Sequence, residues 1–250
     1  MAELQTIYGI HASEALVDKR PDRIVSVWFD QQRVDNKLSA LKEQLAQIGL
    51  AFELVDKKTL DKLSKHSNHQ GVLITAKLPQ ELSEDALKNV LALKEDNAFF
   101  LVLDQVTDPH NLGACLRTAL AAGVDGVIVP KDNACRITAT VCKVASGAAE
   151  AVPVYRVTNL TRTLKWLKTQ GVWLSGAAGE ADKSIFESDL SGSVAIVMGA
   201  EGKGLRKLTL EQCDQLIKIP MINDMESLNV SVAAGIVLYE VVRQNSLVSI

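Results

Sequence analysis

The sequence predicts an α/β protein built on a mainly parallel sheet, and two patterns carry this prediction. Apolar strand candidates alternate with helical patterns through most of the chain, which is the order of a parallel sheet with helical connections. The candidate strand at 99–103, Phe-Phe-Leu-Val-Leu, is apolar at every position, as expected of a strand covered on both faces. With 250 residues, 47% of them hydrophobic, the chain is long enough for one large domain or two small ones.

In the second half of the chain, short apolar runs predict strands, and apolar residues at three- and four-residue spacing predict helices. Strands are expected at 99–103, 126–129, 153–157, 172–177, 193–198 and 215–219. Helices are expected at 111–122, 137–148 and 160–170, with a last helix that runs from about 227 toward 245.

The first 77 residues form a smaller α/β pattern of their own. Strands are expected at 24–29, 52–55 and 71–76, and helices at 8–17, 37–48 and 59–63. A polar, acidic stretch entered through proline, 79–85, then marks a change of composition. We therefore expect three parts: a domain at 1–78, a linker at 79–96 that runs into a helix at 86–94, and a second domain at 97–250.

Charge and cysteine content narrow the classes of function. The net charge of −3 argues against broad, purely electrostatic binding of nucleic acid, although it allows a local basic patch. Four cysteines, without a CxxC pair or metal-ligand spacing to histidine, indicate reduced core residues and no metal site. The first residues lack the basic and apolar segments of a signal peptide, and no apolar run is long enough to span a bilayer. We therefore expect a cytoplasmic protein.

Three strand–loop–helix junctions contain the residues best suited to catalysis or ligand binding. The first contains Asn111 and Arg117, and the second is the glycine-rich run that starts at Gly199. The third passes through Pro220 and reaches Ser227-Leu-Asn at the start of the last helix. Asn and Ser suit a helix start, where free backbone N–H groups can also face a polar ligand. Open α/β sheets bind their ligands at such junctions.

Each of these features, taken alone, also has a plain structural explanation. The glycine run at Gly199 fits neither a Rossmann nor a Walker A pattern and is equally typical of a tight turn. Arg117 lies on an otherwise apolar helix, where it needs a partner such as Glu201, and a purely structural ion pair would satisfy it. Asn111 by itself is slightly better explained as a helix cap.

One stretch near the end of the first unit is locally basic. It contains four lysines and is followed by His66-Ser-Asn-His-Gln-Gly; the lysines are Lys57, Lys58, Lys62 and Lys65. Asp56 and Asp61 dilute its charge. On sequence alone, an ordinary solvated helix face is the favoured explanation.

Taken together, the three junctions resemble the three motifs of the TrmH-type SpoU ribose methyltransferases, of the SPOUT class. The matching segments are Asn111-Leu-Gly-Ala-Cys-Leu-Arg-Thr-Ala, Val197-Met-Gly-Ala-Glu-Gly-Lys-Gly-Leu, and Ile219-Pro-Met with Ser227-Leu-Asn-Val-Ser-Val-Ala. They occur in the order of the family's motifs and without a departure. Tyr8-Gly-Ile-His-Ala and His69-Gln-Gly are similar to the family's RNA-binding domain, which is like ribosomal protein L30. The resemblance therefore covers nearly the whole chain.

The resemblance implies an α/β fold with a deep C-terminal trefoil knot that holds S-adenosylmethionine, in a homodimer with active sites near its interface. It implies an enzyme that methylates the ribose 2′-hydroxyl of a guanosine in 23S ribosomal RNA, in the peptidyl-transferase P loop. Two other functions stay open: a ribose methyltransferase acting on transfer RNA, and an RNA-binding assembly factor that has lost the chemistry. The complete set of polar motif residues speaks against the assembly factor.

The resemblance also implies roles for individual residues. The catalytic group is expected to consist of Asn111, Arg117, Glu201, Ser227 and Asn229. The cofactor is expected at Met198, Gly199, Gly204, Ile219, Pro220, Met221 and Leu228. RNA is expected at Lys58, Lys62, Lys65, His69 and Arg117.

Within the catalytic group, Arg117 has two conceivable roles, general base and electrostatic stabiliser. A guanidinium stays protonated in proteins, so it is a poor general base. We expect Arg117 to bind the RNA phosphate and stabilise the developing alkoxide, oriented by Glu201. Ser227 and Asn229 would then position Arg117 or the ribose, and Asn111 would organise the site.

Overall fold

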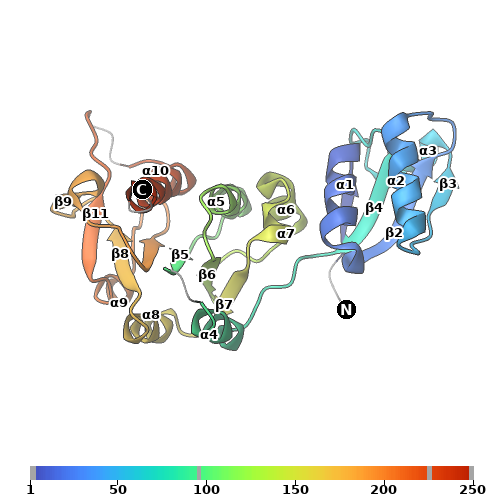
Figure 1. Cartoon of the computed structure of the whole chain (residues 1–250). Coiled ribbons are helices and arrows are strands. Elements are labelled where there is room, and N and C mark those ends of the chain that lie inside the picture. The colour runs from blue at the N-terminus through green and yellow to red at the C-terminus, as the bar shows by residue number, and fades with distance from the viewer. Residues whose placement is uncertain (1–3, 95–96, 224–226, 248–250) are drawn as a thin grey trace. The chain divides into compact units, whose positions relative to one another are not determined.

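The computed structural model describes residues 4–94, 97–223 and 227–247. The chain divides into two compact units, residues 1–79 and 80–250, and each is described by itself (Figure 1). Within the described residues, no helix combines the length and apolar character needed to cross a membrane.

The first unit is a four-stranded mixed sheet with three helices. Its strands are β1 (Leu4–Tyr8), β2 (Ile24–Asp30), β3 (Glu53–Val55) and β4 (Val72–Lys77). The sheet order is β1-β4-β2-β3, in which only the β2–β3 pair is parallel. The helices are α1 (Ile10–Lys19), α2 (Asn36–Gln47) and α3 (Lys57–Leu63), with a short 3-10 turn at Pro21–Arg23.

The core of the first unit follows from alternation along the strands. Phe29 on β2 and Ile74 on β4 are fully buried on one face of the sheet, against the helices α1 and α2. From α2, Leu38, Leu41 and Leu45 enter this core at the helical spacing seen in the sequence. Each fully buried leucine contributes about 1.5–3 kcal/mol relative to an exposed one. These leucines therefore fix α2 against the sheet, as their spacing predicted.

The second unit is built on a seven-stranded sheet in which every pairing is parallel. Its strands are β5 (Phe99–Leu103), β6 (Gly126–Pro130), β7 (Val154–Val157), β8 (Trp173–Ala177), β9 (Lys183–Ser184), β10 (Val194–Met198) and β11 (Gln215–Lys218). The sheet order is β7-β6-β5-β10-β8-β11-β9. The prediction of an α/β fold with a mainly parallel sheet is confirmed.

Helices cover both faces of this sheet (Figure 1). One face carries α5 (Pro109–Ala121), α6 (Ala139–Ala145), α7 (Ala148–Ala151) and α10 (Val230–Leu247), and the other carries α4 (Glu84–Ala92), α8 (Leu160–Thr169) and α9 (Lys207–Leu210). A 3-10 turn, Ile185–Glu187, follows β9. On β5, Leu101 and Leu103 pack toward α5, while Phe100 and Val102 pack toward α4 and α8. This strand is buried on both faces, as its apolar run predicted.

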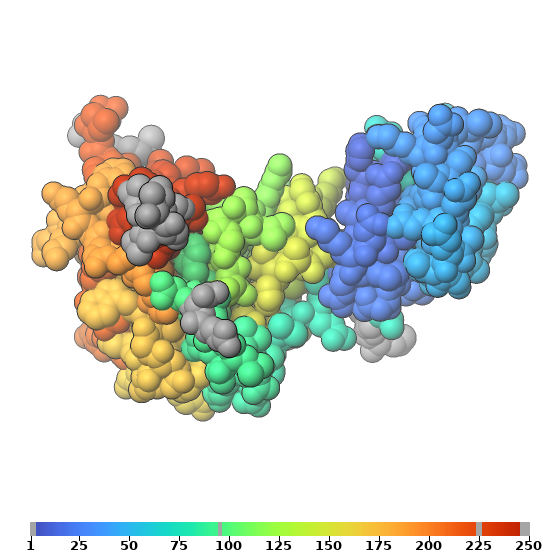
Figure 2. Space-filling model, in the orientation of Figure 1, coloured from blue at the N-terminus to red at the C-terminus, as the bar shows by residue number. Residues whose placement is uncertain are grey.

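Two segments differ from the sequence-based expectation. The helix predicted at 137–148 is two helices, because Ser146 and Gly147 have left-handed backbone with φ of 51° and 90°. The segment predicted as a linker, 79–96, carries α4 close to the predicted helix, but Leu87 of this helix is fully buried in the second unit, so the segment is part of that unit. Figure 2 shows α4 beside α8 on the lower surface of that unit, where Glu84 pairs with Arg162.

Candidate active site

The first two junctions are neighbours because β5 and β10 pair in parallel, with Leu103 opposite Met198 at their carboxyl ends. The glycine-rich loop after β10 is tied to β5 at its far end, where Arg206 pairs with the fully buried Asp104 at 2.6 Å. The Asp108 side chain caps α5 by accepting from the backbone N–H of His110 at 2.8 Å. Asp108, and not Asn111, is therefore the helix cap, which leaves the Asn111 side chain available for other contacts.

The third junction reaches the same place through the start of α10. Asn229 caps this helix, since its Oδ1 accepts from the Ser231 backbone at 3.0 Å and from the Ser231 hydroxyl at 2.6 Å. Its Nδ2 is directed outward from the cap. The expectation that Asn at this position opens the last helix is confirmed, with the helix beginning at Val230.

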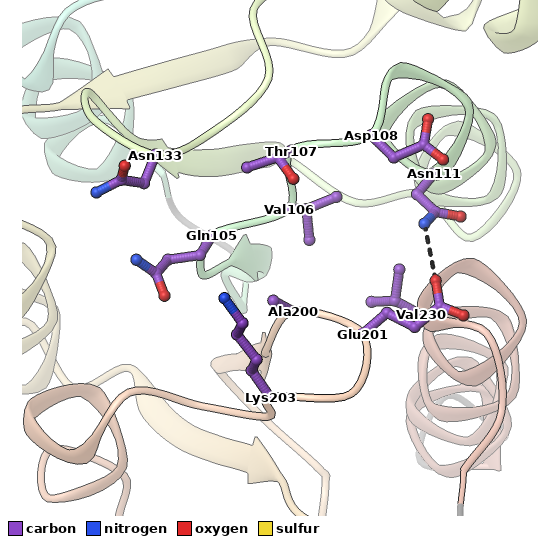
Figure 3. Close-up of a pocket in the computed structure, with 10 residues that line it drawn as sticks. All are labelled: Gln105, Val106, Thr107, Asp108, Asn111, Asn133, Ala200, Glu201, Lys203 and Val230. Carbon is purple, nitrogen blue, oxygen red and sulfur yellow. Dashed lines mark hydrogen bonds between the residues drawn. The ribbon is translucent and has the colours of Figure 1, made fainter.

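Three side chains, one from each junction, form a hydrogen-bonded cluster. Asn229 Nδ2 donates to Asn111 Oδ1 at 2.8 Å and to Glu201 Oε2 at 3.4 Å. Asn111 Nδ2 donates to the same Glu201 oxygen at 3.2 Å (Figure 3). Residues separated by up to 118 positions are thereby fixed against one another. The other carboxylate oxygen of Glu201 has no hydrogen-bond partner among the residues that the structure describes.

Arg117 does not join this cluster. It lies on α5 with an exposed side chain, and within the described parts of the chain it makes no hydrogen bond or ion pair. The expected pairing with Glu201 is therefore not among the contacts of the described residues, in which two amides donate to one of the two carboxylate oxygens of Glu201. Ser227 is also exposed and makes no described side-chain contact.

Gly199 is required by the chain's own loop. A Cβ atom at this position would lie 2.1 Å from the carbonyl carbon of Gly204 and 2.4 Å from the backbone nitrogen of Leu205. We expected the missing side chain to let the backbone approach a ligand, but the close approach is between two parts of the same loop. Ala200 and Gly204 exchange backbone hydrogen bonds at 2.9 and 3.1 Å.

The residues expected to hold the cofactor lie at and after the end of β10 and between the end of β11 and the start of α10. Met198 is buried in the core, Ile219 and Leu228 are half-buried, and Met221 is exposed. The remaining members of this set, Gly199, Gly204 and Pro220, belong to the intervening loops.

A polar cavity of about 370 Å³ lies beside the cluster (Figure 3). Asn111 and Glu201 line one end, and Gln105, Asn133 and Lys203 line the other. The last three were not predicted as site residues. Each follows the carboxyl end of a strand, so collecting every polar side chain at that edge of the sheet would have found them.

The lysines expected to contact RNA are on the surface of the first unit. Lys58 and Lys62 project from α3 one turn apart, and Lys65 follows the helix with left-handed backbone. All three are exposed and have no partner among the described residues.

His69, by contrast, is buried and serves the structure of the first unit. Its Nε2 donates to Asp61 at 3.0 Å, while its Nδ1 accepts from the Gly71 backbone at 3.0 Å. Both ring nitrogens are thus engaged, and His69 ties α3 to the start of β4 rather than presenting a donor to RNA.

No disulfide joins the four cysteines in the part of the chain that the structure describes, and burial makes two of them inert. Burial raises the pKa of Cys115 and that of Cys213 to about 12, so neither forms a thiolate near neutral pH. Among the residues that the structure describes, no three His, Cys, Asp or Glu side chains gather as a metal site.

Both units of the sequence match known family models. Residues 98–239 match the SpoU rRNA methylase family, and residues 6–82 match the RNA 2′-O ribose methyltransferase substrate-binding domain. The chain belongs to the SpoU rRNA methylase family.

Curated relatives align with nearly the whole chain. The 23S rRNA (guanosine-2′-O-)-methyltransferase RlmB of Shewanella oneidensis is 52% identical, over 98% of this chain and 99% of its own. The Escherichia coli protein of that name is 49% identical, over 97% and 99%. The crystal structure of an AdoMet-bound rRNA methyltransferase from Sinorhizobium meliloti shares the fold with a TM-score of 0.78 at 22% identity, covering 96% of this chain and 87% of that one.

Proposed function

We propose that this protein transfers a methyl group from S-adenosylmethionine to the ribose 2′-hydroxyl of a guanosine in 23S ribosomal RNA. The observation that carries the proposal is the cluster of Asn111, Glu201 and Asn229, in which each of the three family motifs contributes one side chain. The relatives named as 23S rRNA guanosine methyltransferases support the substrate, since they align from end to end. The match of residues 6–82 to a substrate-binding model supports an RNA-reading first unit.

The residues at the ends of β10 and β11 fit the cofactor. Ile219 and Leu228 offer half-buried apolar surface, and Met221 adds an exposed apolar side chain beside loops whose backbone is open at Gly204. Such a mixture of apolar side chains and accessible backbone suits a nucleoside with an amino-acid tail. When bound, S-adenosylmethionine supplies a methyl group that is already activated by a positively charged sulfur.

The protein's own contribution to the reaction is then positioning and charge stabilisation. Asn111 and Asn229 hold Glu201 in one orientation, and its second oxygen is left to accept a hydrogen bond from the ribose hydroxyl or from Arg117. Arg117 binds the phosphate next to the target ribose and stabilises the negative charge that develops on the ribose 2′-oxygen as the hydroxyl releases its proton to solvent. Ser227, exposed at the mouth of the third junction, completes the ribose contacts.

The position of Arg117 favours a homodimer with active sites near the interface, the arrangement implied by the family. Its exposed guanidinium has no role within the described parts of one chain, whereas it can act at a site that two copies build together. On α10, Val232 and Tyr239 are about half exposed and lie on one helix face, seven residues apart. They offer apolar surface to a second copy. The C-terminal knot and a cytoplasmic location are part of the same proposal, carried over from the family.

The test is to map ribose methylation on 23S RNA that lacks the modification. Purified protein and S-adenosylmethionine labelled in the methyl group are incubated with this RNA, and the modified nucleotide is located by primer extension. We expect label at one guanosine 2′-oxygen, and the corresponding site should be unmethylated in cells without the protein. Label on transfer RNA in place of 23S RNA, or no transfer to any RNA, would overturn the proposal.

A further inference from the structure

The polar cavity beside the catalytic cluster is built from three adjacent strands. Gln105 follows β5, Asn133 follows β6 and Lys203 lies in the loop after β10. Because the sheet order places β6, β5 and β10 side by side, these three residues meet at one edge. Figure 3 shows them at the end of the cavity away from Asn111 and Glu201, with the Lys203 amino group directed toward Gln105.

The polar side chains at this end are accessible and are not used by the fold. Gln105, Asn133 and Lys203 make no side-chain hydrogen bond within the part of the chain that the structure describes. Gln105 and Asn133 also have left-handed backbone, with φ of 64° and 55°. Asparagine tolerates this conformation, whereas glutamine adopts it at an energetic cost, and strained residues of that kind concentrate at ligand sites. The buried Val106 and Val230 give the cavity an apolar floor.

Two apolar side chains surrounded by amides and one cation match the chemistry of a nucleobase, which has an apolar face and a polar edge. Proteins read unpaired RNA bases by packing their faces and by hydrogen bonding to their edges. Enzymes that modify a base turn its nucleotide out of the stack into such a pocket, and the same movement would bring a target ribose to the adjoining cluster. The cavity volume of about 370 Å³ leaves room for a purine next to the ribose end.

We propose that this cavity holds the base of the target nucleotide and that Lys203, Gln105 and Asn133 select guanine there. The inference rests on the proposed function, whose ribose lies at the Asn111–Glu201 end. Lys203 donates to the guanine O6 and N7 acceptors, and the side-chain oxygens of Gln105 and Asn133 accept from guanine N1–H and the N2 amine.

The donor pattern explains why guanine is preferred to the other bases. Lysine has donors only, and guanine is the base that presents two acceptors, O6 and N7, along one edge. Adenine places an amine where O6 would be, so Lys203 would face a donor. The pyrimidines lack N7. Each correct contact of this kind is worth about 5- to 150-fold in discrimination, the equivalent of about 1–3 kcal/mol.

The cofactor is the competing occupant, and the lining argues against it. None of the seven residues expected to hold S-adenosylmethionine, from Met198 to Leu228, lines the cavity. The two sites adjoin at the cluster, where methyl group and ribose must meet.

The test uses short target RNAs with guanosine, 7-deazaguanosine or inosine at the methylated position. Lys203→Met removes the charge at similar length, and the double variant Gln105→Gly and Asn133→Gly removes both amides while suiting the left-handed backbone. Lys207→Met, an exposed lysine outside the cavity, is the matched control. The kcat/KM of each enzyme is measured on each RNA, together with its affinity for S-adenosylmethionine.

We expect the wild type and Lys207→Met to prefer guanosine over 7-deazaguanosine by at least about fivefold, and Lys203→Met to lose this preference. The double glycine variant should lose the preference for guanosine over inosine. Cofactor affinity should stay within about twofold in all variants. Unchanged preferences in variants that still methylate, or cofactor affinity reduced tenfold, would overturn this inference alone. A wild type that methylates none of the guanosine RNAs would overturn the proposed function itself.

Discussion

The catalytic cluster and the lysines of α3 are both polar, and both are proposed to face RNA, yet they are built in opposite ways. Asn111, Glu201 and Asn229 come from three distant segments and are locked by hydrogen bonds of 2.8–3.4 Å. Lys58 and Lys62 come from one turn of one helix, are exposed, and have no partner among the described residues.

The difference follows from what each region has to do. Methyl transfer requires reacting atoms to be held within a few tenths of an ångström, so its groups must be fixed before the substrate arrives. Binding a phosphate backbone requires charge at about the right place, and long flexible side chains provide it without a fixed geometry. Arg117 is the residue that tests this division, since it is exposed like the lysines but is assigned to catalysis.

The largest effect is expected from Arg117→Ala, which should reduce kcat by about 10²–10³-fold because it removes a donor to the transition state. Arg117→Lys should be nearly as poor, since a point charge cannot reproduce the planar guanidinium. Single-turnover methyl transfer at saturating RNA measures both. Melting temperature and cofactor affinity should be unchanged, as the side chain is exposed.

Arg162→Ala is the matched control, because it removes an exposed arginine from the same unit and should leave kcat unchanged. If Arg117→Lys were as active as the wild type, Arg117 would be a charge contact of the α3 kind, and the division between the two regions would fail at this residue.

A smaller loss of kcat is expected from Asn229→Asp. This variant separates the capping of α10 from the hydrogen bonds that the Asn229 amide donates. Aspartate caps a helix as well as asparagine does, so stability should change by less than about 1 kcal/mol. It cannot donate to Asn111 or Glu201, and it places a negative charge beside that carboxylate. We expect kcat to fall by about 10–10²-fold at an almost unchanged melting temperature. Activity and stability falling together, or neither falling, would show that the cluster is only a cap.

The same contrast between fixed and free groups predicts where the second unit begins. Residues 80–96 contribute buried groups to this unit, so their removal should lower its stability. A fragment beginning at Gln80 keeps α4 and should fold and bind S-adenosylmethionine. A fragment beginning at 97 loses the fully buried Leu87 and leaves Arg156, which pairs with Glu81 in the whole chain, with a largely buried charge. The two losses together should destabilise it by about 5 kcal/mol or more. Urea unfolding of the two fragments measures the difference, and equal midpoints would assign 80–96 to a true linker.

Sequence patterns anticipated what depends on neighbours along the chain and missed what depends on distant segments. The all-apolar run of β5 and the leucine spacing of α2 sufficed to place those elements. The two-residue β9 carries no pattern, since only its pairing with β11 makes it a strand. Family motifs pointed to Asn111, Glu201 and Asn229. That the amides, rather than Arg117, engage Glu201 depends on how α5 and α10 meet, which local sequence does not encode.

The smallest effect is expected from the exposed lysines on and after α3, in the first unit. Replacing Lys58, Lys62 and Lys65 together by Ala should weaken RNA binding and flatten its salt dependence. Each phosphate contact contributes roughly 0.7–0.9 to the slope of log affinity against log salt, through released counterions. Because these side chains make no contacts with described residues, the melting temperature should hold. Cofactor affinity, a property of the second unit, should also be unchanged.

The matched control replaces Lys19, Lys37 and Lys77, three exposed lysines of the same unit, with Ala. It removes the same charge, so a general electrostatic effect would lower both slopes equally. We expect only the α3 variant to lose slope, by up to about 2–3 if all three lysines touch phosphate. Filter binding at a series of salt concentrations gives both slopes. An α3 variant with the wild-type slope would make this helix an ordinary solvated surface and would place RNA binding in the fixed region, at the edge where Asn111, Glu201 and Asn229 meet.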